Sequence, residues 1–181
     1  AILSSSDNGK VWEVVKVLDS SFDALHPSEA GWDVIGNTMY IALRCDNNNV
    51  NYVPVLTYDI STGETSDAVE INEGLMVVDY GKIEAKSRVW VTCSDGNVYV
   101  CSNILPHFKE AERSRIRVTK LNESLEELSY VDIVNPCGCS YFSLVERGGR
   151  FSMLYTEDYR MQIAKCKGDI AMSDVTRYII G

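Results

Sequence analysis

The chain has 181 residues, of which 45% are apolar and 24% are charged, and its formal net charge at pH 7 is -9. This composition is typical of a globular protein and predicts a single domain. The acidic balance, with lysines and arginines scattered along the chain, excludes a nucleic-acid-binding surface, which needs clustered positive charge. No apolar run approaches the roughly 20 residues that span a bilayer, so we expect no membrane span.

The first predicted element is a β-hairpin. The apolar run 1–3 and the apolar residues Val14, Val15, Val17 and Leu18 flank the stretch SSSDNGKVW, residues 4–12. Asp7, Asn8 and Gly9 suit its turn, because asparagine and glycine tolerate the positive φ of a tight turn.

Three groups of four strand-like runs follow. The first group, 31–72, contains WDVIG, NTMYIALRCD, NYVPVLTYD and SDAVEI. The second, 73–121, contains GLMVVDYG, SRVWVTCSD, NVYVCSN and RIRVTKLN, and the third, 129–168, contains SYVDIVNP, SYFSLVERGG, GRFSMLYTED and RMQIAKCKG. A repeat of about 45 to 50 residues, each with four strands, predicts the blades of a β-propeller.

Within each group the second and third runs are the most apolar, which predicts inner strands. The more charged fourth run, such as RIRVTKLN, predicts an outer edge strand. The charged insert at 105–117 predicts a short helix from Lys109 to Arg113 on a solvated face. The last run, within 172–181, either starts another blade or closes onto the first.

The cysteines do not predict a metal site. Cys137 and Cys139 are separated by one glycine, without a second cysteine pair or a histidine at ligand spacing. We therefore expect thiols buried in the core, with no metal and no cofactor. The even number of cysteines also permits disulfides, so the redox state stays open. The six cysteines are Cys45, Cys93, Cys101, Cys137, Cys139 and Cys166.

The hairpin at residues 1–19 carries the most specific pattern in the chain. Ser5-x-Asp7-x-Gly9-x-x-Trp12 resembles the Asp-box of BNR-repeat β-propellers, the sialidase-like superfamily, with Val11 where threonine is usual. The resemblance implies that this turn joins the third and fourth strands of a blade on the outer rim, so Ser5, Asp7, Gly9 and Trp12 are structural. Residues 1–19 are then half a blade. We expect an all-β propeller, either an incomplete ring of about three and a half blades or a compact ring of four.

The same resemblance suggests catalytic candidates. The segment from Val145 to Phe151 looks like the strand-turn-strand in which sialidases carry the glutamate that activates their nucleophile, which implies this role for Glu146. Tyr155 and Asp158 resemble residues at strand ends of propeller glycosidases, where two carboxylates act on the glycosidic bond.

Substrate carboxylates are bound by arginine clusters in sialidases. The candidates here are Arg44, Arg147 and Arg160. The sequence departs from the family after the strand that follows Glu146, where Thr156 and Glu157 occupy the expected arginine position.

Three functions are compatible with these observations. The first is a carbohydrate-related recognition module that binds a glycan, a glycoprotein or another protein. The second is a glycoside hydrolase or sialidase fragment, and the third is a structural or assembly propeller completed by a second chain. The sequence leaves the cellular location open, with an extracellular or cell-surface one favoured.

Overall fold

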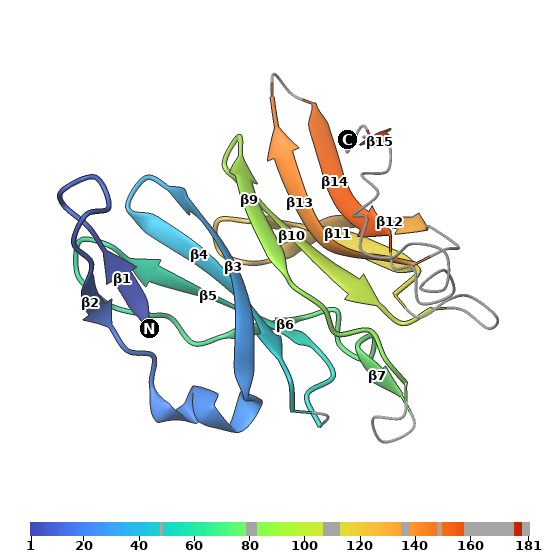
Figure 1. Ribbon diagram of the computed structural model, residues 1–181, viewed down its shortest axis with the longest axis horizontal. Helices are drawn as coiled ribbons and strands as arrows, with labels where there is room; N and C mark the ends of the chain where they lie inside the picture. Colours follow the sequence, from blue (N-terminus) through green and yellow to red (C-terminus); the bar gives the residue numbers. More distant parts are fainter. Residues whose placement is uncertain are drawn as a thin grey trace.

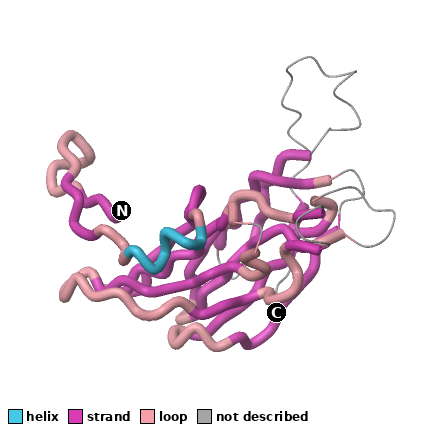
Figure 2. Tube along the Cα trace, turned by 90° about the horizontal axis from the view of Figure 1, so that it is seen from below, coloured by secondary structure: helices cyan, strands magenta, loops and turns pink. Residues whose placement is uncertain are grey.

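The described structure is all-β. A computed structural model describes residues 1–47, 49–78, 83–106, 113–134, 138–147, 150–157 and 176–178. Its regular elements are fifteen strands and one short 3₁₀-helix, η1 (Ser20–Leu25) (Figures 1 and 2). Within these ranges no helix is both long enough and apolar enough to cross a membrane.

Three antiparallel sheets follow one another along the chain, and in each the neighbouring strands are consecutive in sequence. Sheet I contains β3 (Pro27–Ile35), β4 (Thr38–Cys45), β5 (Val53–Asp59) and β6 (Val69–Ile71). Sheet II contains β9 (Trp90–Ser94), β10 (Asn97–Ile104), β11 (Arg115–Asn122) and β12 (Glu127–Val134). Sheet III contains β13 (Cys139–Glu146), β14 (Phe151–Glu157) and β15 (Thr176–Tyr178).

Two smaller pairs complete the strands. The hairpin of β1 (Ile2–Ser4) and β2 (Glu13–Lys16) stands at the side of sheet I, and η1 connects it to β3 (Figure 1). The pair β7 (Val77–Val78) and β8 (Ile83–Glu84) lies between sheets I and II in the sequence.

Side chains that alternate along the strands build the core between neighbouring sheets. In β4, Tyr40 and Ala42 face sheet II, whereas Ile41 and Leu43 face the β1–β2 side. This period of two is expected for strands covered on both faces. Sheet II is likewise covered by sheet I on one face and by sheet III on the other. The core between sheets II and III includes Tyr99, Cys101, Ile116, Val118, Phe142, Leu144, Phe151 and Met153.

The first strands of the three sheets lie next to one another, β3 beside β9 and β9 beside β13. Gly31 allows the first of these contacts, because a Cβ at this position would lie 2.7 Å from the Cα of Trp90. At the second contact, the hydroxyl of Thr92 and the indole N–H of Trp90 both donate to the carbonyl of Leu144, at 2.6 and 3.1 Å. The sheets therefore fan out from adjoining first strands (Figure 1).

Sheet I spans residues 27–71, close to the predicted group of strands at 31–72, whereas the strands after residue 73 pair differently from the prediction. The described residues of 77–84 form the pair β7–β8, and sheet II starts at Trp90 and takes residues 127–134 as its fourth strand. Residues 115–122 are therefore not the predicted outer edge. The predicted strand within 160–168 and the predicted helix at 109–113 lie outside the described residues, apart from Arg113 in a turn.

The prediction of an outer edge was wrong because the charge of Arg117 on β11 is neutralised within the sheet. The guanidinium of Arg117 donates to both carboxylate oxygens of Asp132 on β12, at 2.7 and 2.8 Å, and lies 3.7 Å from the ring centroid of Tyr130. Ile116 and Val118 on the same strand are fully buried. A strand with charged residues can thus be internal when its neighbour supplies the counter-charge.

Candidate functional site

The β1–β2 turn is organised by the carboxylate of Asp7. Its Oδ1 accepts hydrogen bonds from the backbone N–H of Lys10 at 3.0 Å and of Val11 at 2.9 Å. The Ser5 hydroxyl donates to the same oxygen at 2.8 Å and accepts from the N–H of Gly9 at 2.9 Å. The bond from Val11, followed by that from Ser5, lowers the pKa of Asp7 from its ordinary value of 3.8.

Gly9 and Trp12 stabilise the same turn through a second set of contacts. Gly9 has a φ of 82°, a left-handed conformation that favours glycine. The indole N–H of Trp12 donates to the carbonyl of Gly9 at 3.0 Å, and the ring lies against the glycine while remaining 58% exposed. The four residues predicted to be structural thus form one hydrogen-bonded unit.

Two further turns are also held by one side-chain oxygen each, with donors at other spacings than in the Asp7 turn, and these hydrogen bonds were not predicted from the sequence. Asp59 Oδ1, at the end of β5, accepts from the N–H of Ser61 at 2.8 Å and of Thr62 at 2.9 Å. Asn122 Oδ1, at the end of β11, accepts from the N–H of Ser124 at 3.0 Å and of Glu126 at 2.9 Å. The available signal was an aspartate or asparagine at the end of each third strand, where such side chains stabilise turns.

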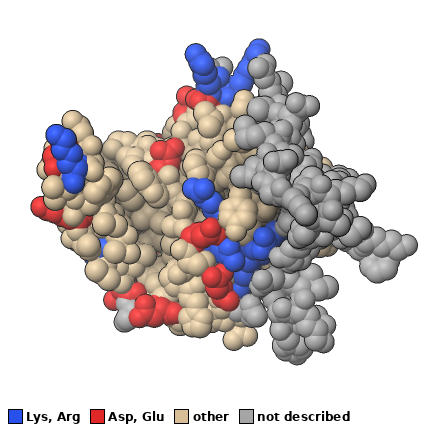
Figure 3. Space-filling view, in the orientation of Figure 1, with Lys and Arg blue, Asp and Glu red and all other residues tan. Residues whose placement is uncertain are grey.

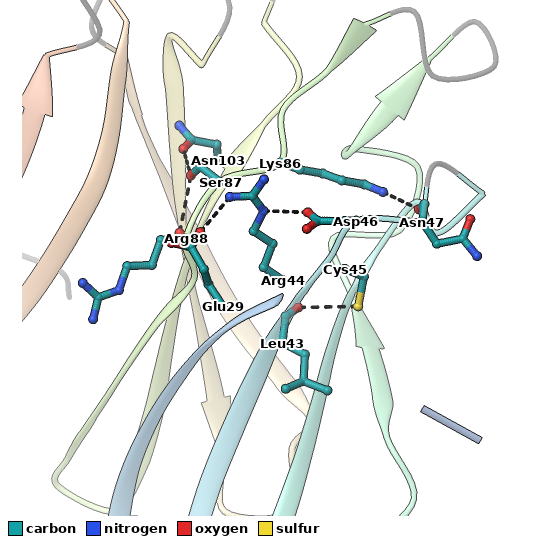
Figure 4. A network of polar contacts seen from close by, with 10 residues as sticks. All are labelled: Glu29, Leu43, Arg44, Cys45, Asp46, Asn47, Lys86, Ser87, Arg88 and Asn103. Atoms are coloured by element: carbon teal, nitrogen blue, oxygen red, sulfur yellow. Dashed lines mark hydrogen bonds and ion pairs between the residues drawn. The ribbon is translucent and has the colours of Figure 1, made fainter. Parts of the chain in front are cut away.

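Arg44 joins two carboxylates at the end of β4 (Figure 4). Its Nη1 donates to Glu29 at 2.7 Å and its Nε donates to Asp46 at 2.9 Å. Partial burial acts against the charged guanidinium, but the two carboxylates outweigh it and raise the pKa of Arg44. Arg44 thus holds two acidic side chains of its own chain, which engage its Nε–H and one N–H of Nη1.

A buried polar network continues from this cluster toward sheet III (Figure 4). The ammonium group of Lys86 donates to the carbonyl of Asn47, and the hydroxyl of Ser87 donates to the side chain of Asn103. The side-chain amide of Asn103 then donates to the carbonyl of Cys139 at 2.8 Å. Arg44 and the start of β13 therefore lie at the same end of the sheets.

Glu146 lies at the opposite end. It closes β13, seven residues from Cys139, and pairs with Phe151. At about 3.3 Å per residue, roughly 23 Å of strand separates Glu146 from the end near Arg44. Tyr155 is four residues along β14 from Phe151, or roughly 13 Å, and packs against the core between sheets II and III. The structure does not bring Glu146 to Tyr155.

Of the remaining predicted site residues, Arg147 is described by the structure. Arg147 is exposed and forms the β13–β14 turn through backbone hydrogen bonds with Arg150. Asp158 and Arg160 lie outside the described residues. In the described part of the chain, no cluster of three or more histidines, cysteines and acidic residues could hold a metal ion.

The described cysteines are thiols within the sheets. Burial raises the pKa of Cys45 to about 11 and that of Cys93 to about 12, and it raises the pKa of Cys101 as well. These thiols are poor nucleophiles, because the thiolate is the reactive form.

An apolar groove with a volume of about 590 Å³ lies between the β1–β2 hairpin and sheet I. Figure 3 shows the hairpin standing away from the body, with a mostly uncharged surface between them. The floor of the groove is formed by alternate residues of β3 and β4, and Trp32 on this floor is 60% exposed. The floor residues are Ser28, Ala30, Trp32, Met39, Ile41 and Leu43, and the hairpin contributes Ile2, Leu3 and Trp12.

Comparisons with known proteins identify no family. No family model and no curated protein matches the chain. Among solved structures, a GH43 β-1,3-galactosidase matches with a TM-score of 0.47 and 15% sequence identity. The match covers 73% of this chain and 27% of the galactosidase, so the chain spans about a quarter of that enzyme.

Proposed function

We propose that this chain is a protein-recognition module, built as part of a β-propeller with Asp-box-type turns, and that the groove beside Trp32 is its binding surface. The propeller is supported by consecutive antiparallel sheets whose first strands adjoin and whose faces are packed on each other. The turn at Asp7 adds support, since its carboxylate accepts from the N–H groups of Lys10 and Val11 within the spacing that resembles an Asp-box.

The observation that carries the proposal is the chemistry of the groove. Its floor is apolar over two strands, and Ser28 is the single hydroxyl-bearing residue that lines it. Exposed apolar grooves of this size commonly receive apolar side chains of a partner. A sugar, by contrast, loses hydrogen bonds to water when it binds, and it needs several polar side chains of the protein to take their place.

The placement of the catalytic candidates favours recognition over hydrolysis. Glu146 and Tyr155 are separated by roughly 13 Å of strand, beyond hydrogen-bond reach. Glu29 and Asp46, the carboxylates nearest Arg44, both accept hydrogen bonds from that arginine. Neither arrangement offers a nucleophile with its activating base.

Glycan binding is the second candidate, because the indoles of Trp32 and Trp12 are both exposed along the groove. A flat, amphipathic ring can pack against the apolar face of a sugar. This function would use the same surface with a different ligand.

The test first selects ligands of the protein and then measures their affinity for a variant without the Trp32 side chain. The immobilised protein is screened against a displayed random-peptide library and a glycan array, and hydrolysis of fluorogenic glycosides, sialosides included, is assayed. We expect peptide ligands whose affinity falls about tenfold or more in Trp32→Ala, as for a central aromatic contact. The matched control is Val69→Ala, an exposed apolar residue on β6, which should leave affinity unchanged. Glycan binding that depends on Trp32 would establish the second candidate, and turnover of a glycoside would overturn both.

A further inference from the structure

The β1–β2 turn contains Asn8, the one asparagine of the chain that is followed directly by a glycine, Gly9. Both residues are exposed. The backbone nitrogen of the residue after an asparagine can attack the Cγ of the asparagine side chain, which closes a five-membered succinimide ring. Glycine favours this attack, because it has no side chain to obstruct the ring and its backbone is the least restricted. Residues 8 and 9 are therefore the dipeptide of this chain most open to the attack.

The folded turn holds the attacking nitrogen in a hydrogen bond. The N–H of Gly9 donates to the hydroxyl oxygen of Ser5 at 2.9 Å. The Ser5 hydroxyl gives its own proton to Asp7 Oδ1 at 2.8 Å, so toward Gly9 it acts as an acceptor. To attack Asn8, the nitrogen must lose its proton and turn toward the Asn8 side chain. Both changes break the hydrogen bond to Ser5.

The charge of the turn acts in the same direction. Loss of the proton leaves a negative charge on the Gly9 nitrogen, which then faces the lone pairs of the Ser5 oxygen. The carboxylate of Asp7 is bound to that oxygen, and the N–H groups of Lys10 and Val11 favour its ionised form. Two negative charges so near to each other repel. The folded turn therefore opposes the step that starts the reaction.

We propose that Asn8 is a site of spontaneous modification, at which the side-chain amide is lost as ammonia and the turn is opened, and that the Ser5 hydroxyl keeps this reaction slow while the turn is folded. The reaction uses water and needs no enzyme, oxidant or cofactor. It concerns the hairpin itself and is independent of any ligand in the groove.

The atoms balance over two steps. Hydroxide removes the proton of the Gly9 N–H, the nitrogen forms a bond to Cγ of Asn8, and the bond from Cγ to Nδ2 breaks. Nδ2 takes a proton from water and leaves as ammonia, which restores the hydroxide. Water then adds to one of the two carbonyl carbons of the ring. Addition at Cγ gives aspartate, whereas addition at the main-chain carbon gives isoaspartate, in which the chain runs through Cγ.

Isoaspartate at this position adds one backbone atom to the turn. The hydrogen bonds from the N–H groups of Lys10 and Val11 to Asp7 Oδ1 span the added atom, as does the bond from Gly9 to Ser5. The acceptors precede this atom and the donors follow it, so the added length moves the donors away from the acceptors. We therefore expect the isoaspartate product to open the turn.

The test compares rates of modification at pH 8 in the folded protein and in the chain unfolded by guanidinium chloride. Mass spectrometry of proteolytic peptides measures the loss of the amide, and chromatography separates aspartate from isoaspartate. Asn37 is the internal control, since it is exposed in the β3–β4 turn and is followed by Thr38. Of three variants, Ser5→Ala removes the acceptor, Ser5→Thr keeps a hydroxyl, and Ser6→Ala changes an exposed neighbour.

We expect Asn8 to react faster than Asn37 in the unfolded chain, and more slowly in the folded protein than in the unfolded chain. In folded Ser5→Ala the reaction should be about three- to tenfold faster than in the parent protein, as for the loss of one hydrogen bond. Ser5→Thr and Ser6→Ala should keep the parent rate. Amide exchange in β10 verifies that the sheets stay folded in each variant.

Three results would overturn the proposal. Equal rates at Asn8 and Asn37 in the unfolded chain would remove the reactive site. Equal rates in folded Ser5→Ala and in the parent protein would remove the protective role of Ser5. In the protein that contains isoaspartate, the amides of Lys10 and Val11 should exchange about tenfold faster than before modification. Unchanged exchange of these amides would show that the turn stays closed.

Discussion

The carboxylate of Asp33 on β3 accepts a hydrogen bond of 2.7 Å from the backbone N–H of Cys93 on β9. Its other oxygen accepts from the N–H of Val34 at 2.8 Å. Two residues earlier, Gly31 brings the backbone of β3 against that of Trp90. The first strands of sheets I and II thus meet through a close backbone approach at Gly31 and a hydrogen bond between the Asp33 side chain and the backbone of Cys93. The stability of this junction should be sensitive to very small changes.

Gly31→Ala tests the close approach. The added methyl group would lie 2.7 Å from the Cα of Trp90 and 2.8 Å from the carbonyl oxygen of Val89, and neither backbone atom can move aside cheaply. We expect the free energy of unfolding to fall by about 1–3 kcal/mol, as for overpacking in a core. Urea denaturation measures it. Ala30→Ser, at the neighbouring exposed position, is the control and should stay within about 0.5 kcal/mol of the parent protein.

Asp33→Ala tests the hydrogen bond that joins the same strands. Removal of the carboxylate leaves the N–H of Cys93 without this acceptor in a partly buried position. We expect a loss of about 1–3 kcal/mol in the free energy of unfolding. Asp33→Asn should recover part of that loss, because the amide keeps one acceptor oxygen of the two. An alanine variant as stable as Glu73→Ala, an exposed control, would contradict this role.

Much of the fold could be predicted from the sequence, because alternation and turn residues are local signals. The strands of sheet I and the β9–β10 and β13–β14 hairpins lie where their apolar runs predict them. The pairing of the later strands could not be predicted. β11 has charged residues yet is internal, and its neutralisation depends on Asp132, fifteen residues away in sequence and opposite it in space.

The site was predicted less completely. The turn at Asp7 depends on residues within one short segment, and its internal hydrogen bonds follow the predicted spacing. Strand direction and sheet order decide how Glu146, Tyr155 and Arg44 lie relative to one another. Neither can be predicted from a single stretch of sequence. The groove is formed by Trp32 on β3 together with the β1–β2 hairpin, which belongs to a different sheet. No local sequence pattern therefore predicts it.

Asp7→Ala should loosen the β1–β2 turn without unfolding the sheets. The variant removes the acceptor for the N–H groups of Lys10 and Val11. We expect their amide exchange to accelerate by about tenfold, as for the loss of a hydrogen bond to a charged group. Hydrogen exchange followed by NMR measures it, and amides in β10 serve as the internal control. An equal acceleration in β10 would show that the turn stabilises the whole fold instead.

The pH dependence of the turns follows from their carboxylates. The Val11 bond is the largest cause that lowers the pKa of Asp7, and the Ser61 hydroxyl is the largest for Asp59. A depressed pKa in the folded state means that the stabilisation is present above the ordinary value of 3.8 and is lost as the pH falls through the folded pKa. We expect the amides of both turns to lose protection below pH 3.8. In the turn at Asn122 the carboxylate of Glu126 accepts from the side-chain amide of Asn122, but the backbone N–H groups of Ser124 and Glu126 donate to an amide oxygen that does not titrate. These two amides should therefore keep more of their protection over the same range.

The buried thiols should react only after unfolding. The raised pKa values, about 11 for Cys45 and about 12 for Cys93, leave very little thiolate at pH 8, and Cys101 is fully buried. Alkylation with iodoacetamide at pH 8 should therefore be at least about a hundredfold slower in the native protein than in denaturant. Peptide mapping by mass spectrometry identifies each labelled cysteine. Rapid native labelling at Cys101 would mean that the core between sheets II and III opens readily, which contradicts the packing around Ile116 and Phe142.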